Sequence, residues 1–265
     1  MNSTKNSKKP IKIESKQIAT IINIFKISIQ DFLSSPFLGM TILPFVITTM
    51  LLFGIFLYFG GEFFQLFMQG NGADLSFINP QEHPWLASIL AFSFVKWIVV
   101  TFFYLIGGAF VILISVIVAT IIIGFFTPRI VRVIRERHYP DIELKEGFSI
   151  SKLIWIYAKI FLAFIGLSLL CIPLLLLPGV NLVIFNIPFY YLFHNLLVLD
   201  VVSNINTEEE FKIIKEKKRG QLYLATMIFY LMSLIPLVGM IGTVFFIITL
   251  SHIVFLATRE IRTQN

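Results

Sequence analysis

The sequence predicts an all-α integral membrane protein with two long transmembrane helices, two re-entrant helical hairpins and an N-terminal interfacial amphipathic helix. Of the 265 residues, 57% are hydrophobic and 14% are charged, against roughly 25% charged in an average soluble domain. Uncharged runs cover residues 37–60, 97–126, 160–199 and 222–252. Because about 20 apolar residues cross a bilayer, each run is long enough to enter it, and the last two could enter twice.

The N-terminal part is predicted to be a tail followed by a surface helix. Residues 1–16 are polar and rich in lysine, which indicates a disordered basic tail rather than a cleaved signal peptide. Residues 17–35 place apolar side chains at helical spacing, with Ser28 and Asp31 mostly on the opposite face. This pattern predicts an amphipathic helix on the membrane surface. We expect residues 17–265 to form a single helical membrane domain.

Two long spans should follow, at about residues 37–60 and 86–126, joined by a polar loop at 61–84. The uncharged run 97–126 would make about 45 Å of helix, more than the roughly 30 Å hydrocarbon core. The second span is therefore expected to tilt or to project beyond the bilayer. Gly107 and Gly108 would permit a kink or close helix packing. Thr127-Pro128 indicates the start of a new helix.

Basic residues gather in four segments, and these predict the topology through the positive-inside rule. Nineteen of the 21 Lys and Arg lie within residues 1–26, 127–152, 200–221 and 259–262. All four segments are cytoplasmic if the N-terminus is, and the 61–84 loop, which has no Lys or Arg, is then external. We expect a multi-pass protein of the bacterial inner membrane with both termini in the cytoplasm. The net charge of +6 then indicates contact with anionic lipid rather than nucleic acid.

The last two apolar runs predict hairpins at about residues 153–199 and 221–257. Each breaks near its middle, at residues 178–181 and 236–239, where the turn has no charge. A turn that emerges into water usually carries polar groups, so we expect both tips to stop within the membrane. Pro173 and Pro188 should shorten the straight helix on either side of the first turn. Two ordinary hairpins, giving six full spans, are the alternative.

The two hairpins also resemble each other. Pro178 precedes His194 by sixteen residues, and Pro236 precedes His252 by the same sixteen. This spacing indicates an internal structural repeat, which is common in transporters.

These features are similar to those of the CysZ-type sulfate permeases and their eukaryotic relatives, the etoposide-induced proteins. The resemblance covers roughly residues 20–260. The stretches that carry it are Ile42-Leu43-Pro44-Phe45, Gly124-Phe125-Phe126-Thr127-Pro128-Arg129, Leu177-Pro178-Gly179-Val180 and Leu234-Ile235-Pro236-Leu237-Val238-Gly239.

The resemblance implies two long membrane helices, two partly penetrating hairpins, oligomeric assembly and uptake of sulfate for cysteine synthesis. It also implies a Gly-Leu-Arg-type motif just before the first span, whose arginines contact the anion. Here that stretch reads Pro36-Phe37-Leu38-Gly39-Met40, without arginine. This departure affects the expected solute and leaves the expected fold unchanged.

The hairpin tips supply the first part of a predicted anion path. A helix N-terminus can bind an oxyanion through its unpaired N–H groups and partial positive charge. Re-entrant hairpins would place two such termini at membrane depth. The alternative is that proline and glycine only make tight turns. The path residues predicted at the tips are Pro178, Gly179, Asn181, Gly239 and Thr243.

Three further residues and one basic cluster complete the predicted path. His194 and His252 would carry a proton or meet an anion, or would be hydrogen-bonded histidines at the interface. Lys96 would attract an anion on the outer side, unless it only snorkels beside Trp97. A cytoplasmic basic cluster would receive the anion or bind lipid headgroups, and it consists of Arg129, Arg132, Arg135 and Arg137.

An enzyme is not expected, because the sequence contains no GxSxG, HExxH, P-loop or CxxC motif. Cys171 is the only cysteine, so no intramolecular disulfide is possible. We expect no cofactor and no metal site. The predicted function is a permease for an inorganic oxyanion, sulfate first, with lipid, the anion and further copies of the chain as partners. The alternative is a membrane scaffold that organises lipid without transporting a solute.

Overall fold

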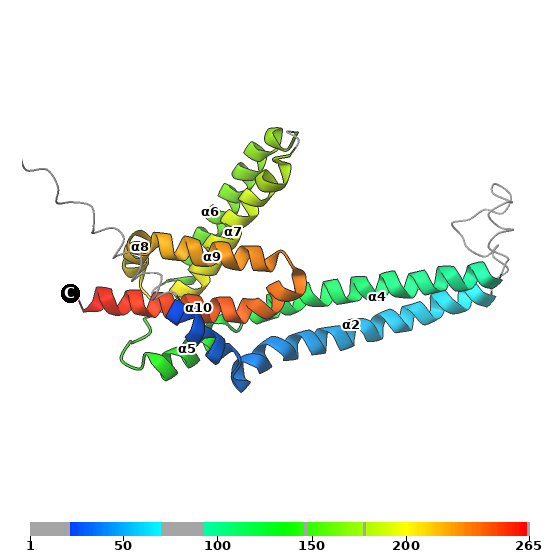
Figure 1. Ribbon diagram of the computed structural model, residues 1–265, viewed down its shortest axis with the longest axis horizontal. Coiled ribbons are helices and arrows are strands. Elements are labelled where there is room, and N and C mark those ends of the chain that lie inside the picture. Colours follow the sequence, from blue (N-terminus) through cyan, green and yellow to red (C-terminus); the bar gives the residue numbers. More distant parts are fainter. Residues whose placement is uncertain (1–21, 70–92, 146–147, 177–178, 264–265) are drawn as a thin grey trace, which may run out of the picture. The chain divides into compact units, whose positions relative to one another are not determined.

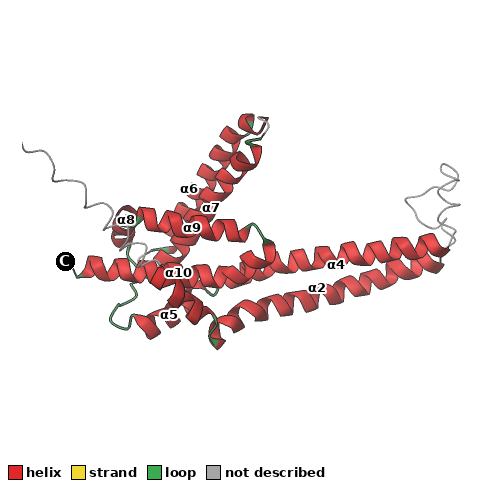
Figure 2. Cartoon of the chain, in the orientation of Figure 1, coloured by secondary structure: helices red, strands yellow, loops and turns green. Residues whose placement is uncertain are grey.

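The computed structural model describes residues 22–69, 93–145, 148–176 and 179–263, and every regular element in these ranges is helical (Figure 2). This confirms the predicted all-α class. Five helices are long and apolar enough to cross a membrane: α2, α4, α6, α7 and α10. Residues 22–32 form a first helix. The labelled elements are α2 (Ser35–Gln69), α4 (Ser93–Gly124), α5 (Thr127–His138), α6 (Ile150–Cys171), η1 (Pro173–Leu176), α7 (Asn181–Ser203), α8 (Glu208–Lys217), α9 (Arg219–Ser233) and α10 (Pro236–Arg262) (Figure 1).

The described residues form two compact units. The first contains those within 1–41 and 123–265, and the second contains those within 42–122.

The second unit is a pair of long helices, made by most of α2 and α4. Their contact is aromatic, with the rings of Phe63 and Phe103 stacked at 4.2 Å and those of Phe56 and Phe103 at 5.6 Å. A Cβ added at Gly107 would lie 2.4 Å from the Phe56 ring, so this glycine permits the close approach of the two helices. Of the two glycines expected to allow close packing, Gly107 is the one in contact. At 35 residues, α2 is longer than the predicted span and ends at Gln69.

The core of the first unit is α10, which packs against α5, α7, α8 and α9. Nearly every side chain from Val244 to Thr258 is buried. The turn before α10 depends on a glycine, because a Cβ at Gly239 would lie 3.0 Å from the Ser233 backbone at the end of α9. The second predicted hairpin is therefore α9 and α10, and α10 continues to Arg262, beyond the predicted end at 257.

The first predicted hairpin consists of α6 and α7, which pack against each other (Figure 1). Just before Pro173, α6 ends at Cys171, and α7 begins at Asn181 after Gly179, whose φ of 87° suits a residue without a Cβ. The expectation that Pro188 shortens the helix is wrong, because Pro188 lies buried inside α7. A proline removes one backbone N–H, and a packed membrane helix tolerates this loss when neighbouring groups satisfy the freed carbonyl.

The predicted helix start at Thr127-Pro128 is confirmed, since proline occupies the first turn of α5. Pro is favoured there because the first N–H groups of a helix have no partner within it. The charged helix α8 begins with a capping box, in which the Thr207 hydroxyl and the Glu210 carboxylate each accept a backbone N–H. Both helices are short and lie outside the membrane-length segments.

The first helix, residues 22–32, packs into the first unit through a face that carries both apolar and polar side chains. Ser28 and Asp31 are 0% and 6% exposed, whereas Ile22 and Ile29 are 61% and 48% exposed. The Phe25 ring also packs against this unit, so the buried face is mixed rather than polar. This orientation brings the carboxylate of Asp31 against α5 and α10.

Candidate functional site

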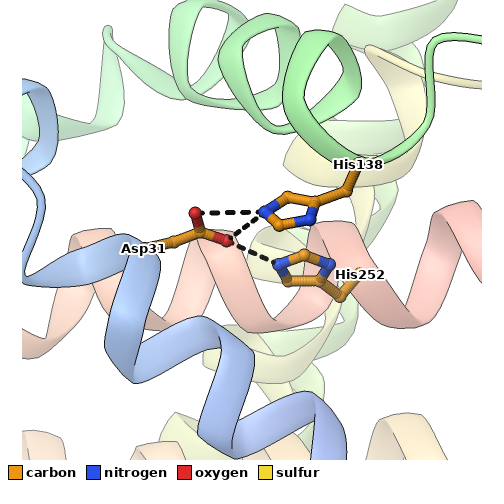
Figure 3. A group of neighbouring side chains, drawn as sticks. All are labelled: Asp31, His138 and His252. Atoms are coloured by element: carbon orange, nitrogen blue, oxygen red, sulfur yellow. Dashed lines mark hydrogen bonds and ion pairs between the residues drawn. The ribbon is translucent and has the colours of Figure 1, made fainter.

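A cluster of titratable side chains joins three segments that are far apart in the sequence (Figure 3). Asp31 lies near the end of the first helix, His138 is the last residue of α5, and His252 lies in the buried stretch of α10. We call these three residues the Asp31 cluster. Both imidazoles point their Nε2 atoms at the one carboxylate, as the dashed lines in Figure 3 show.

The distances within the Asp31 cluster are those of direct hydrogen bonds and ion pairs. His138 Nε2 is 2.9 Å from Asp31 Oδ2, and His252 Nε2 is 3.1 Å from the same oxygen. His252 and Asp31 are 1% and 6% exposed, whereas the side chain of His138 keeps 35% of its surface open. The cluster is therefore buried on the α10 side and accessible on the α5 side.

Tyr139 fixes the orientation of the His252 ring. Its hydroxyl lies 2.9 Å from His252 Nδ1, so both ring nitrogens of this histidine are engaged. The tyrosine ring is held between the Phe255 ring, stacked at 4.9 Å, and the Arg259 guanidinium, at 5.3 Å. Burial raises the pKa of Tyr139 to about 12, so its hydroxyl stays protonated near neutral pH.

Arg137 closes the other side of the carboxylate. Its guanidinium Nη1 lies 3.3 Å from Asp31 Oδ1 and donates to Ser34 Oγ at 3.0 Å. It also lies over the ring of the fully buried Phe37, 5.3 Å from the centroid. Phe37 is in the stretch before the first span that contains no arginine, and Arg137 of α5 brings a guanidinium to it.

The protonation of Asp31 follows from its neighbours. Burial alone would raise the pKa of this carboxyl, but hydrogen bonds from His252 and His138 outweigh burial and lower the pKa. Asp31 is therefore a carboxylate at neutral pH. Two imidazoles and one guanidinium face it, so the negative charge of the carboxylate is surrounded by basic side chains.

A second polar cluster fixes the end of α10. Arg262 donates to both oxygens of Glu210, at 2.9 and 3.0 Å, and Lys145 Nζ lies 3.0 Å from Oε1. Asn206 donates to Glu210 Oε2 at 3.0 Å and to Thr258 Oγ1 at 2.8 Å. Burial opposes ionisation of Glu210, but these donors outweigh it and lower the pKa to about 2. Its oxygens are occupied by protein donors, which indicates a structural role.

His194, at the corresponding position in the first hairpin, makes its direct contacts with neutral groups. Its Nδ1 lies 2.7 Å from Thr226 Oγ1 of α9, and its ring stacks on Tyr223 at 4.0 Å. Tyr190 donates to the backbone carbonyl of Tyr223 at 3.0 Å. These contacts join α7 to α9 and match the interpretation of a hydrogen-bonded histidine.

The predicted residues at the two tips lie apart from each other and from the Asp31 cluster. Asn181 is exposed, and its Oδ1 accepts the N–H of Leu182. Thr243 donates to the carbonyl of Gly239 at 2.8 Å. Pro178 is outside the described residues. Within the first unit, the turn between α6 and α7 and the turn between α9 and α10 lie at separate places (Figure 1).

The predicted basic residues are also dispersed. Lys96 lies near the start of α4 in the second unit and is half-buried. Arg129 and Arg132 are exposed on α5, and Arg135 donates through Nε to the carbonyl of Ile142 at 2.6 Å. Of the four arginines in the predicted cytoplasmic cluster, Arg137 is the one that contacts the Asp31 cluster.

Sequence reasoning identified His252 and Arg137 but missed Asp31, His138 and Tyr139 as their neighbours. The sequence places Asp31 on the polar face of a predicted surface helix. A buried acid on that face has the same spacing along the sequence as an exposed one, so the pattern does not distinguish them. His138 and Tyr139 follow the arginine-rich stretch of α5 and carry no motif. The signal that could have found them is the adjacent Arg137-His138-Tyr139 run at a helix end, next to a membrane span.

Comparison with known proteins gives a family and no individual relative. A family model described as "Sulfate transporter CysZ/Etoposide-induced protein 2.4" matches residues 24–242. This range contains α2 to α9 in full, most of the first helix and the first seven residues of α10, and it ends before His252. No curated protein and no solved structure matches the chain.

Proposed function

The chain belongs to the sulfate transporter CysZ/etoposide-induced protein 2.4 family, and on that premise we propose that it is a permease for an inorganic oxyanion, sulfate first. The family match over residues 24–242 is the observation that carries this proposal. The multi-pass helical architecture supports it. We further propose that the protein lies in a bacterial inner membrane and takes up sulfate for sulfur assimilation.

Charge supports an orientation with both termini in the cytoplasm. Outside the spans, α5 carries four arginines and α8 to α9 carries the lysine-rich stretch 212–219. The positive-inside rule places such segments on the cytoplasmic side. The Asp31 cluster at the end of α5 is then near the cytoplasmic exit of an anion.

Helix length supports partial insertion of the second hairpin. At 15 residues, α9 is about 22 Å long, and about 30 Å of helix is needed to cross the hydrocarbon core. Its partner α10 is largely buried by protein from Val244 to Thr258, whereas Leu237 and Ile241 near the turn are 48% and 45% exposed. The first hairpin has helices of 22 and 23 residues, which are long enough to cross. We therefore propose that the two hairpins reach different depths in the membrane.

Arg137 is the residue that we propose contacts the anion at the start of the first span. It lies over Phe37 and is 34% exposed, so part of its guanidinium remains open to a ligand. Guanidinium binds tetrahedral oxyanions through paired N–H groups. This residue compensates for the missing arginine in the 36–40 stretch.

The alternative function, a lipid-organising membrane scaffold, is favoured by a specific observation. The predicted path residues do not converge on one place in the first unit, and α6 exposes apolar side chains over most of its length. A homo-oligomer would cover part of this surface and would bring the tips of several chains together.

The test is uptake of labelled sulfate into liposomes that contain the purified full-length protein, with empty liposomes as the reference. We expect saturable uptake that Arg137→Gln reduces at least several-fold. Lys212→Gln removes the same charge from an exposed ion pair on α8 and should leave uptake unchanged. Uptake no greater than in empty liposomes, from protein shown to be folded and inserted, would reject transport in favour of the scaffold.

A further inference from the structure

We propose that Asp31, His138 and His252 form a binding site for a divalent transition-metal ion, with zinc the best match to the ligand set. One ligand atom from each residue lies within 4.8 Å of the others. Two imidazoles and one carboxylate are among the commonest ligand sets of zinc and of other first-row metals. This inference is independent of whether the protein transports an anion.

The spacing of the ligand atoms is close to that of a metal site. Zinc bonds to histidine nitrogen and carboxylate oxygen of about 2.0–2.2 Å place tetrahedral ligands about 3.3 Å apart. The two Nε2 atoms lie 2.9 and 3.1 Å from Asp31 Oδ2. A separation larger by a few tenths of an ångström would admit the ion, and small rotations of the side chains supply that change.

The outer contacts are those expected around metal-binding histidines. A ligating histidine usually hydrogen-bonds through its other ring nitrogen, which fixes the tautomer and the ring orientation. In His252 that nitrogen is Nδ1, and it lies 2.9 Å from the Tyr139 hydroxyl. When Nε2 binds the ion, Nδ1–H donates to the tyrosine oxygen. Tyr139 can accept this bond through the lone pairs of its hydroxyl oxygen.

The site has an entry and an open coordination position. His138 keeps about a third of its side chain exposed, so an ion can approach from the α5 side. Three protein ligands leave the fourth position of a tetrahedral zinc for water or an anion. The ligands come from residues 31, 138 and 252, so the ion would connect the first helix, α5 and α10.

Arg137 opposes the ion and sets the affinity. Its guanidinium binds Asp31 Oδ1, which also lies 3.1 Å from His138 Nε2, so the guanidinium and the ion compete for the same carboxylate. The charges still repel each other at this distance. A site with this neighbour should bind zinc more weakly than a site without it.

The Glu210 cluster is a useful contrast, because it also places a carboxylate among several nitrogen atoms. Its oxygens accept from nitrogen atoms of Arg262, Lys145 and Asn206, and these nitrogens can only donate. Such nitrogen atoms offer no lone pair to a metal. The imidazoles of the Asp31 cluster do offer one, and this chemical difference singles the cluster out.

The test is zinc retention by the full-length protein in lipid nanodiscs, after removal of any affinity tag and treatment with EDTA. Zinc is added, excess is removed by desalting, and bound metal is measured by plasma mass spectrometry. We expect about one zinc per chain, together with a higher melting temperature and, with cobalt, the visible absorption of a tetrahedral ion.

Matched histidine variants decide between the cluster and other sites. His138→Gln is the main test because His138 is partly exposed and its loss should preserve folding, and Asp31→Asn is the second. We expect each to lower zinc retention at least tenfold and to abolish the cobalt spectrum. His194→Gln should retain one zinc, because His194 faces Thr226. No zinc on folded wild-type protein, or equal retention by wild type, His138→Gln and Asp31→Asn, would overturn the proposal.

Discussion

The two hairpins share the spacing of their histidines but hold them in opposite kinds of surroundings. His194 in α7 contacts a hydroxyl and an aromatic ring, whereas His252 in α10 contacts a carboxylate and a tyrosine. The difference arises from the neighbours. The α7 histidine faces α9, and the α10 histidine faces Asp31 of the first helix and the end of α5. Equivalent positions in a repeat therefore need not have equivalent chemistry.

The ends of the hairpins show the same contrast. In the first hairpin, the carboxyl of Asp200 accepts from the Tyr157 hydroxyl at 2.8 Å. In the second, Arg262 binds the buried Glu210 through two nitrogens. The second hairpin is thus held by ionic groups at two places, the Asp31 cluster and the Glu210 cluster. The first hairpin is held mainly by neutral hydrogen bonds. This comparison predicts which substitutions are most costly.

The largest effect is expected from removing the histidine of the second hairpin. His252→Leu leaves the buried Asp31 carboxylate without one of its donors, and a hydrogen bond to a charged group contributes about 1.5–3 kcal/mol. His194→Leu leaves the Thr226 hydroxyl bonded to the Leu222 carbonyl, so it removes one neutral hydrogen bond, which contributes about 0.5–1.5 kcal/mol. Thermal unfolding at one heating rate should therefore rank wild type above His194→Leu, and His194→Leu above His252→Leu.

A glutamine variant checks the interpretation. His252→Gln retains an N–H donor for Asp31, so its melting temperature should lie between those of wild type and His252→Leu. Equal melting temperatures for the two leucine variants would show that the ionic surroundings of His252 contribute nothing beyond burial. That result would remove the contrast between the hairpins.

An intermediate effect is expected at the second ionic contact. Glu210→Gln removes the charge that Arg262 and Lys145 bind, and hydrogen bonds to charged groups contribute about 1.5–3 kcal/mol. Because the pKa of Glu210 falls from 4.5 to about 2 on folding, its stabilisation is complete above pH 4.5 and is lost as the pH falls toward 2. The melting-temperature difference between wild type and Glu210→Gln should be largest near pH 7 and shrink below pH 4.5.

An exposed ion pair of α10 is the control for this pH dependence. Glu260→Gln breaks the pair with Lys218, in which the Glu260 side chain is 57% exposed. Pairs of this kind contribute about 0–1 kcal/mol, so this variant should melt close to wild type at every pH. A Glu210→Gln difference that stays constant from pH 7 to pH 3 would contradict the lowered pKa.

Sequence patterns predicted the helices well because membrane insertion imposes long apolar runs and clear breaks. The start of α5 at Thr127-Pro128 and the end of α6 before Pro173 follow directly from the properties of proline. The interior position of Pro188 could not be read this way, because it depends on tertiary packing around α7. The same limit applies to Asp31. Its helix was predicted, but which face enters the protein depends on α5 and α10, which lie more than 100 residues away.

The smallest effect is expected from two tyrosines that flank the equivalent histidines. Tyr139→Phe removes the hydroxyl at His252 Nδ1 from a buried site and should cost about 1 kcal/mol. Tyr190→Phe removes a hydroxyl from a more exposed contact beside His194 and should cost less. Zinc affinity should distinguish the two tyrosine variants further. Loss of the group that orients a ligating histidine typically lowers metal affinity about 10–100-fold, so Tyr139→Phe should weaken zinc binding and Tyr190→Phe should not. Equal zinc affinity in both variants would mean that Tyr139 only packs against Phe255, and the two hairpins would then differ in charge but not in metal chemistry.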